Sequence, residues 1–199
     1  RVRGSNLRPL RQFGQVGAEL IGSDAPTADV EMILMATNGL QGLGVTELSV
    51  DLGMPTLVTA ICNHLGIQDE DEKRILRAAL NQKDAATISA LGGNTASVLN
   101  NLLLAVGPVD KSLSIMKQMQ LPPTAKHELD HLELVVSHLN DRAPSLSLTV
   151  DPVEIRGYEY HTRLTFTIFA KGVRGELGRG GRYISVDNHG KGEGEKATG

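Results

Sequence analysis

The sequence is short of cysteine and of long apolar stretches, and both shortages limit what the protein is. Among its 199 residues there is one cysteine, Cys62, so no disulfide can form within the chain. This cysteine lies in the apolar stretch 56–65, which predicts a helix, and we expect a buried structural thiol in a reducing cytoplasm rather than a catalytic one. No apolar run approaches the roughly 20 residues needed to cross a bilayer, so we expect no membrane insertion.

The sequence also lacks a strong excess of charge of either sign. Twenty Lys and Arg residues stand against 23 Asp and Glu residues, which gives a formal net charge of −3 at pH 7. No general positive field therefore draws the chain to nucleic acid, and any RNA binding would be local. The first residue is Arg1, with neither an initial methionine nor a leader peptide in view, so we expect the sequence to be a fragment.

Hydrophobic patterning predicts an α+β domain with strands toward both ends of the chain. A period of two over residues 12–21 predicts a strand that places Gln15 and Glu19 on one face. The tail, 188–199, is rich in Gly, Lys and Glu and predicts a loop. The other expected elements are a helix over 27–42, a strand over 47–52, a helix over 55–66, a region of about five helices over 69–140, and strands over 146–150, 158–169 and 180–186.

Residues 127–131 read His-Glu-Leu-Asp-His, which matches the pattern in which two histidines on one helix face bind catalytic zinc. The longer form of that pattern needs a glycine and a third histidine at a spacing that His138 does not have. The helix also has a simpler role, because its Leu and Val stripe predicts core packing, with all three histidines on a more polar side. We therefore expect no bound metal, with zinc as the alternative.

Two further patterns are candidates for phosphate binding. The glycines from Gly175 to Gly181 are closely spaced, but a strand pattern follows them, whereas phosphate loops lead into a helix. We expect instead a tight turn or the close approach of another backbone segment. The loop over residues 1–11 carries four arginines, whose guanidinium groups suit a phosphate or a carboxylate, with a solvated basic loop as the alternative.

Three segments, in this order, resemble signature motifs of the histidyl-tRNA synthetase family. Residues 8–22 resemble the second motif, 156–166 resemble the histidine-specific Arg-Gly segment, and 180–183 resemble the Gly-Gly-Arg-Tyr turn. The resemblance implies a class II aminoacyl-tRNA synthetase-like fold, which is an antiparallel sheet flanked by helices. It also implies that residues 1–199 are part of that catalytic domain, with a helical insertion at about 69–140 and with the first and third motifs outside the sequence.

By position, the resemblance implies a histidine-binding site on the face of the sheet. Gln15 and Glu19 would bind the amino group, and Arg156 would bind the carboxylate. The remaining residues would line the imidazole side, where His161 stands in place of a tyrosine common in synthetases. The full expected set is Gln15, Glu19, Arg156, Tyr160, His161 and Tyr183.

The positions for ATP are only partly kept. Arg1 matches the arginine that contacts the α-phosphate and Arg11 follows in the same loop, but Arg3 replaces a glutamate that meets the adenine. A histidine pocket beside an altered ATP motif resembles the regulatory subunits of ATP phosphoribosyltransferase. That resemblance implies no catalysis and no cofactor, but activation and histidine feedback of a short catalytic subunit, by a cytoplasmic homodimer within a hetero-oligomer. The alternative is an active histidyl-tRNA synthetase that binds ATP and tRNA.

Overall fold

The computed structural model describes residues 14–154, 161–186 and 194–199, which form one sheet and its covering helices. The strands are β1 (Leu20–Ile21), β2 (Leu48–Gly53), β3 (Gly107–Pro108), β4 (Ser147–Asp151), β5 (His161–Ala170), β6 (Gly178–Ser185) and β7 (Glu195–Thr198). The helices are α1 (Pro26–Gly42), α2 (Leu57–His64), α3 (Glu70–Asn81), α4 (Ala85–Ala90), α5 (Gly93–Leu104), α6 (Val109–Gln118) and α7 (Pro123–Arg142). The expected α+β class is confirmed.

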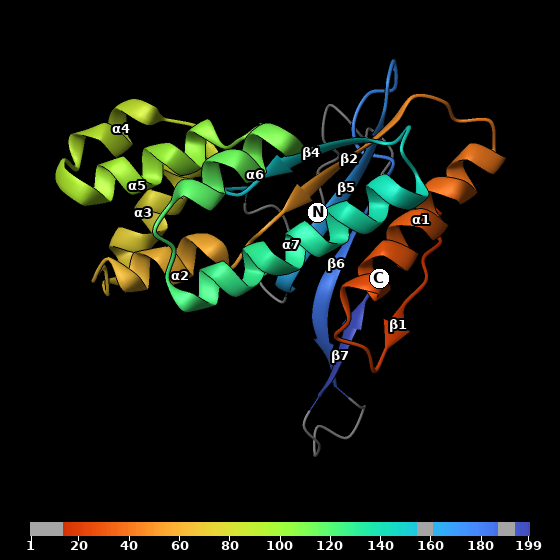
Figure 1. The fold of residues 1–199 in the computed structure, drawn as a ribbon, viewed down its shortest axis with the longest axis horizontal. Coiled ribbons are helices and arrows are strands. Elements are labelled where there is room, and N and C mark those ends of the chain that lie inside the picture. Colours follow the sequence, from red (N-terminus) through yellow and green to blue (C-terminus); the bar gives the residue numbers. More distant parts are fainter. Residues whose placement is uncertain (1–13, 155–160, 187–193) are drawn as a thin grey trace, which may run out of the picture.

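The sheet has the strand order β1-β7-β6-β5-β2-β4-β3, which puts β5 near its middle. Neighbouring strands are antiparallel except β2 and β4, which are parallel and which the sequence did not predict as a pair. A parallel pair needs a long connection, and here the connection runs from α2 to α7. In Figure 1 the last strand, β7, lies beside β1, so segments from both ends of the sequence meet at one edge of the sheet.

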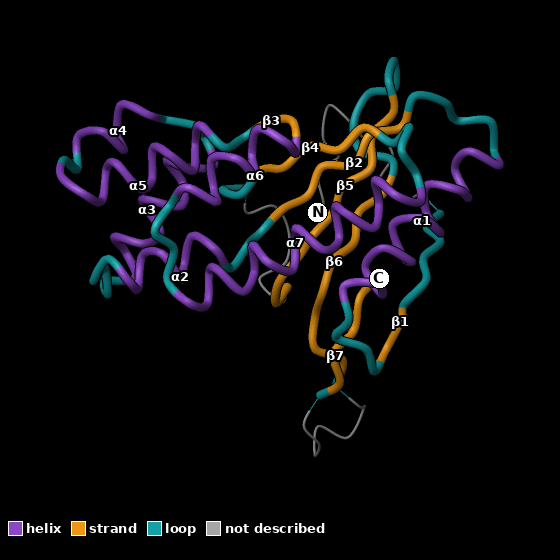
Figure 2. Tube along the Cα trace, viewed as in Figure 1, coloured by secondary structure: helices purple, strands orange, loops and turns teal. Residues whose placement is uncertain are grey.

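Helices α1 and α7 pack against each other and against β5, and they form the layer in front of the sheet in Figure 1. Helices α2 to α6 gather into a lobe at the opposite side, where α6 packs against β3 and β4 (Figure 2). One apolar core runs through both parts. Its side chains include Val30 and Ile33 of α1, Val50 and Leu52 of β2, Leu132 and Leu139 of α7, and Phe166 and Ile168 of β5.

Local sequence signals set the helix ends in the lobe. Asp69 Oδ1 accepts a hydrogen bond from the backbone N of Glu72 at 2.8 Å and thereby caps α3. Asp84 caps α4 in the same way, and Gly92, with a φ of +69°, separates α4 from α5. Residues 69–140 thus contain α3 to α6 and most of α7, as the helical spacing predicted. That this region is an insertion stays a prediction.

The strand expected over residues 12–21 is wrong for most of its described part. Only Leu20 and Ile21 pair with β7, and residues 14–19 are irregular and exposed. The partner of Leu20 is Thr198, so the same antiparallel register would place residue 18 opposite a position beyond residue 199. Among the described residues this segment has no partner strand, and an unpaired strand leaves its backbone groups to water.

The loop expected over the tail is wrong for Glu195–Thr198, which form β7 between β1 and β6. Its backbone groups find partners on both sides, which outweighs the weak strand propensity of Glu, Lys and Ala. Residues 187–193 of the tail lie outside the described residues. In the described part of the chain, no helix combines the length and the apolar character that crossing a membrane would require.

Replacing Leu52 with alanine is expected to lower the free energy of unfolding by about 2–5 kcal/mol, because a fully buried side chain leaves a cavity in a packed core. Urea unfolding followed by circular dichroism measures the change. Met35→Ala on the outer side of α1, where the side chain is 49% exposed, is the control and should cost less than about 0.5 kcal/mol. Equal effects of the two variants would contradict the placement of the core.

Candidate functional site

The sheet face that turns away from α1 and α7 carries three of the expected histidine-site residues. Along β5 the side chains alternate, with Leu164 and Phe166 buried toward the helices and Thr165 on the other side. His161 and Tyr183 are direct partners on β5 and β6. Side chains of direct partners stand about 5 Å apart at Cβ, so the structure brings these two residues together.

Glu19 lies on the same face as His161. Gly181 and Gly199 exchange two backbone hydrogen bonds, of 2.9 and 3.3 Å, so Cβ atoms placed on them would point to the same side. A Cβ at Gly199 would lie 2.9 Å from Glu19 Cγ, and a Cβ at Gly181 would lie 3.0 Å from His161 Cδ2. The carboxylate expected for an ammonium group and the histidine expected for an imidazole therefore share one surface.

Of the other expected site residues that the structure describes, Gln15 is not brought into this group. Gln15 is exposed in the irregular segment before β1, so the strand that was to align it with Glu19 is absent. Arg156 and Tyr160 lie outside the described residues, as do the expected phosphate-binding residues, Arg1 and Arg11. Their roles stay predictions.

Gly53 and Gly181 lie in the middle of this face. Thr165 lies between them, and the sequence had not indicated it as a site residue. Gly53, Thr165 and Gly181 are consecutive partners across β2, β5 and β6. A Cβ at Gly53 would lie 2.5 Å from Thr165 Oγ1, and one at Gly181 would lie 2.9 Å from Leu164 O. The close backbone approach expected for the glycine-rich segment is thus confirmed. A shallow hollow on this face is lined by Glu154, His161, Thr165, Phe166, Thr167, Glu176, Arg179 and Gly180.

Behind Tyr183, toward the helices, the side chain of Arg182 is almost completely buried, at 2% exposure. Its Nε donates to Asp29 Oδ2 at 2.8 Å, and its Nη1 donates to Asp24 Oδ1 at 3.2 Å. It also donates to two backbone carbonyls just before α1, those of Ser23 at 3.0 Å and Ala25 at 2.6 Å. The arginine of the Gly-Gly-Arg-Tyr motif therefore anchors β6 to the start of α1.

The second histidine of the zinc-like pattern belongs to this buried group. His131 is buried in α7, and its Nε2 lies 2.6 Å from Asp29 Oδ2. The expectation that all three histidines lie on a more polar side is wrong for His131, whereas His127 is exposed and His138 is half-buried. Within the ranges that the structure describes, no three His, Cys, Asp or Glu side chains gather in a way that could hold a metal ion. His131 is engaged by a carboxylate instead.

Three positively charged side chains contact Asp24 at the outer end of this buried group. Arg163 Nη1 and Arg182 Nη1 lie 3.0 and 3.2 Å from its Oδ1, and Lys196 donates to its Oδ2. Burial acts to raise the pKa of Asp24, but the hydrogen bond from Lys196 and the three positive charges together hold this pKa below its usual value. A cavity of about 90 Å³ lies here, lined by Asp24, Thr162, Arg163, Arg182, Tyr183, Ile184, Lys196 and Ala197.

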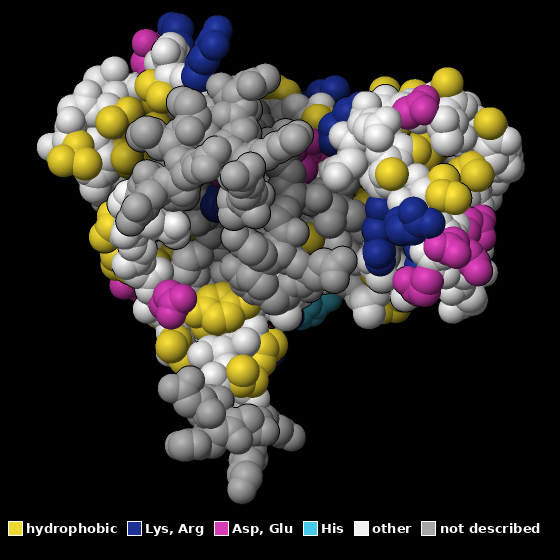
Figure 3. All heavy atoms as spheres, turned by 180° about the vertical axis from the view of Figure 1, so that it is seen from behind, with side chains coloured by type: hydrophobic (Ala, Val, Ile, Leu, Met, Phe, Trp, Pro, Cys, Tyr) yellow, Lys and Arg dark blue, Asp and Glu magenta, His cyan; other side chains and the backbone are white. Residues whose placement is uncertain are grey.

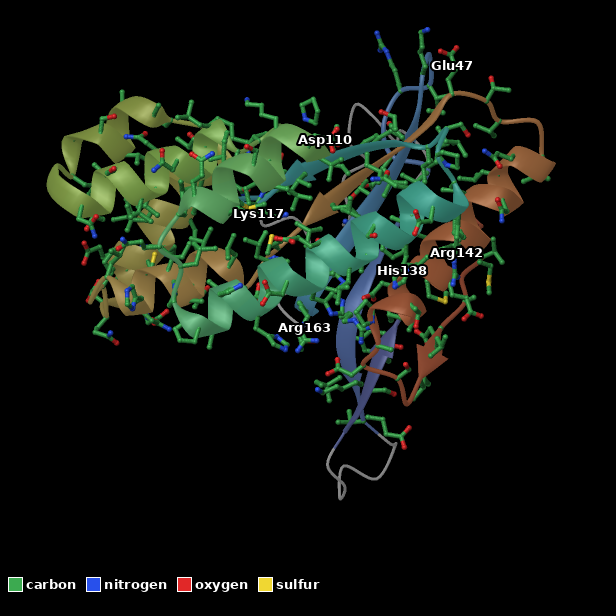
Figure 4. All side chains as sticks on the ribbon, viewed as in Figure 1. Glu47, Asp110, Lys117, His138, Arg142 and Arg163 are labelled. Carbon is green, nitrogen blue, oxygen red and sulfur yellow. The ribbon has the colours of Figure 1, made fainter. Side chains whose placement is uncertain are left out.

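Glu128, the glutamate of the zinc-like pattern, serves another contact. Its Oε1 accepts a hydrogen bond from Thr56 Oγ1 at 2.7 Å at the start of α2, and its Oε2 is buried with no hydrogen-bond partner among the described residues. Burial raises the pKa of Glu128, partly offset by the hydrogen bond from Thr56 and the positive charge of Arg163. Figure 4 shows Arg163 below α7, the helix that carries Glu128.

The surface of the helical lobe carries charges of both signs. Figure 3, which views the molecule from behind, shows basic and acidic side chains side by side on this lobe. On α3, for example, Arg74 Nη2 lies 2.9 Å from Asp71 Oδ1. Such exposed pairs contribute little stability and do not create a positive surface of the kind that attracts nucleic acid.

Comparison with known sequences gives a consistent set of relatives. The family model for histidyl-tRNA synthetase matches residues 1–199. An ATP phosphoribosyltransferase regulatory subunit from Paramagnetospirillum magneticum is 51% identical over 100% of this chain, which corresponds to 51% of that protein. A protein of the same name from Rhodospirillum centenum is 46% identical over 100% of this chain and 50% of its own length. The chain spans about half the length of the curated relatives it matches.

Solved structures give the same fold. A Bacillus halodurans protein described as an ATP phosphoribosyltransferase regulatory subunit/histidyl-tRNA synthetase has a TM-score of 0.76 at 23% identity, over 90% of this chain and 48% of that one. Histidyl-tRNA synthetase from Nostoc sp. PCC 7120 has a TM-score of 0.74 at 16% identity, over 90% and 46%. An ATP phosphoribosyl transferase complex from Thermotoga maritima contains a chain with a TM-score of 0.70 at 18% identity, over 90% and 63%. The expected synthetase-like fold is confirmed.

Replacing Glu128 with glutamine is expected to raise the free energy of unfolding at pH 7. Burial raises the pKa of this carboxyl in the folded protein, so stability falls as the pH rises from the unfolded-state pKa through the folded-state pKa. The amide carries no charge and can still accept the hydrogen bond from Thr56. Urea unfolding at pH 7 and at about pH 4, near the ordinary pKa of a glutamate, should show a gain that shrinks on acidification.

The matched control is Asp130→Asn, which removes the same charge from an exposed position of α7. Asp130 pairs with Lys126 at 2.8 Å, so its removal should leave stability unchanged or slightly lower. A loss of stability in Glu128→Gln at pH 7, or a gain independent of pH, would show that burial of the charge is not what destabilises this position.

Proposed function

Because the chain belongs to the histidyl-tRNA synthetase family, we propose that it is part of a regulatory subunit of ATP phosphoribosyltransferase that acts in histidine biosynthesis. The high identity to regulatory subunits along the whole of the given sequence supports this proposal. The chain corresponds to about half of those proteins, so the activity of the whole protein is part of the proposal.

The proposed subunit performs no catalysis of its own. It activates a short catalytic subunit, which condenses ATP with phosphoribosyl pyrophosphate, and it passes on feedback from histidine. The absence of adenylation is supported by Arg3, which reverses the charge where synthetases use a glutamate to meet adenine. Amino-acid activation needs all the groups that position the triphosphate, so this change argues against it. The Thermotoga maritima structure, described as a complex, supports the presence of a catalytic partner.

Histidine is the proposed ligand, and the arrangement of His161, Tyr183 and Glu19 is the observation that carries this proposal. These three side chains share one sheet face, on which the hollow lined by His161 and Thr165 also lies. A carboxylate suits the ammonium group of an amino acid, while an imidazole and a phenol offer hydrogen bonds to its ring. Arg156, Tyr160 and Gln15 complete the proposed site. Coupling between histidine binding and the active state is expected to amount to about 1–3 kcal/mol.

A homodimer within a hetero-oligomer, located in the cytoplasm, completes the proposal. Cys62 supports a reducing compartment, because this single cysteine is buried in α2 at 1% exposure and burial raises the pKa of its thiol. The competing function is an active histidyl-tRNA synthetase, favoured only by the family resemblance and by the kept Arg1. Under that alternative the protein would also bind tRNA.

Mixing the full-length protein with a short-form catalytic subunit of ATP phosphoribosyltransferase tests the proposal directly. We expect turnover of ATP and phosphoribosyl pyrophosphate to rise on mixing and to become sensitive to histidine. The measurement is formation of phosphoribosyl-ATP by the catalytic subunit alone, with the protein, and with the protein plus histidine. No effect on turnover, together with histidine-dependent ATP–pyrophosphate exchange by the protein alone, would establish the synthetase alternative.

Replacing Glu19 with alanine is expected to weaken histidine binding at least tenfold, or by about 1.4 kcal/mol, because the ammonium group loses its carboxylate. Isothermal titration calorimetry measures the affinity. Glu31→Ala removes the same charge from an exposed position of α1 and should leave the affinity unchanged. Unchanged affinity in Glu19→Ala would mean that the ammonium group is bound elsewhere.

A further inference from the structure

We propose that Arg182 is a positioning residue for the histidine site, and that His131 of α7 acts on this site through Asp29 and Arg182. The inference rests on the proposed function, because it assigns Tyr183 to a histidine-binding face. It extends that function by naming a path of direct contacts from the ligand face of the sheet to the helical layer behind it.

Arg182 and Tyr183 are consecutive residues of β6, so their side chains point to opposite faces of the sheet. Arg182 is buried on the helix side, while Tyr183 pairs with His161. The contacts of Arg182 therefore hold the backbone of β6 from the helix side, one residue before Tyr183. Whatever fixes the guanidinium group also fixes the direction in which the tyrosine ring leaves the strand.

The guanidinium group is held more firmly than a single ion pair would hold it. Its four hydrogen bonds to Ser23, Asp24, Ala25 and Asp29 range from 2.6 to 3.2 Å and use all three nitrogens. A guanidinium is planar, and bonds from three of its nitrogens fix its plane as well as its position. Two of the acceptors are backbone carbonyls, which cannot move unless the segment before α1 moves with them.

Asp29 connects this anchor to α7. Its Oδ2 is shared by Arg182 Nε at 2.8 Å and His131 Nε2 at 2.6 Å, while its Oδ1 is buried without a hydrogen-bond partner in the described part of the chain. The direction of the carboxylate is thus set from two sides, by a strand and by a helix. A shift of α7 relative to α1 would turn Asp29 and pull on Arg182.

His131 is the member of this group whose removal is best suited to a test. Replacing Arg182 would leave a buried carboxylate without its charged partner, which is strongly destabilising and endangers folding. Replacing His131 leaves Asp29 paired with Arg182. Phenylalanine keeps an aromatic ring at position 131 but offers no donor to Asp29, so His131→Phe isolates the contact.

The position of Tyr183 can be measured without any ligand. The given sequence has three tyrosines. In full-length protein labelled with 3-fluorotyrosine, comparison with Tyr183→Phe identifies the fluorine resonance of Tyr183. We expect His131→Phe to shift or broaden this resonance and to weaken histidine binding by about three- to tenfold, which is up to about 1.4 kcal/mol. His131→Gln, whose amide can donate to Asp29, should restore part of both.

Two controls separate positioning from a general structural role. His127→Phe makes the same substitution at an exposed position one turn earlier in α7 and should change neither readout. In a Tyr183→Phe background, which lacks the tyrosine hydroxyl, His131→Phe should lose most of its effect on histidine affinity, because coupled residues are not additive. If His131→Phe does not fold, His131→Leu replaces it with the same expectations.

A Tyr183 resonance and a histidine affinity that both stay unchanged in a folded His131→Phe or His131→Leu variant would overturn the inference, even if stability falls. Additive effects of His131→Phe and Tyr183→Phe would do the same. Failure of the proposed function looks different, since the unsubstituted protein would then leave the turnover of the catalytic subunit unchanged. The fluorine resonance of Tyr183 would still decide whether His131 positions that ring.

Discussion

The fold depends on one buried ionic contact, the one between Arg182 and Asp29. Both side chains are at least 98% buried, since their exposures are 2% and 1%. Removing two charges from water costs several kcal/mol each, and the cost is offset only where geometry is good and the remaining donors are satisfied. Arg182 meets that condition through Asp24 and two backbone carbonyls. The contact joins α1, β6 and, through His131, α7, so it fixes how the helical layer sits on the sheet.

This arrangement gives the two faces of the sheet different tasks. The helix side holds the apolar core around the ionic group, and its packing holds the strands in place. The other side has a floor of glycine around Thr165 and carries Glu19, His161 and Tyr183. Polar side chains can lie on that face because it is not part of the apolar core. Alternate side chains of β6 point to opposite faces, so this strand contributes to both. A binding face and a structural anchor thus occupy neighbouring positions of one short motif.

The sequence predicted the elements well where their signals were local. Asp69, Asp84 and Gly92 mark helix ends that depend only on nearby backbone groups, and all three have that role in the structure. Strand pairing depends on distant partners, and the predictions failed at the sheet edge formed by β1 and β7, although β2, β4, β5 and β6 lie close to where they were expected. Residues 14–19 alternate as a strand should but form no strand ladder with the other described residues, whereas the polar residues 195–198 become a strand because β1 and β6 flank them.

The candidate site was predictable in part for the same reason. Family motifs named His161, Tyr183 and Glu19, and the register of the strands brings these three to one face. Nothing in the spacing of α7 distinguished His131 from His127, because the difference is made by Asp29, which lies 102 residues away in sequence. The sequence identified Arg182 as part of the Gly-Gly-Arg-Tyr motif, but it did not predict that this side chain is buried. Side chains that find their partners across such distances can be recognised only once the chain is folded.

The charges around Arg163 explain why Arg182 keeps an ionised partner, Asp24, at neutral pH. The positive charge of Arg163 acts to lower the pKa of both Asp24 and Glu128, yet the pKa of Asp24 is lowered overall and that of Glu128 is raised. Asp24 accepts hydrogen bonds from Lys196 and from Arg163 itself, so its ionised form is favoured despite burial. Among the described residues, Glu128 accepts a hydrogen bond only from the neutral hydroxyl of Thr56, and burial therefore dominates. Direct contact with a cation, rather than proximity to one, decides the sign. The ionised form of Asp24 is thus favoured just before α1, where it pairs with Arg182. The ionised form of Glu128 is disfavoured in α7.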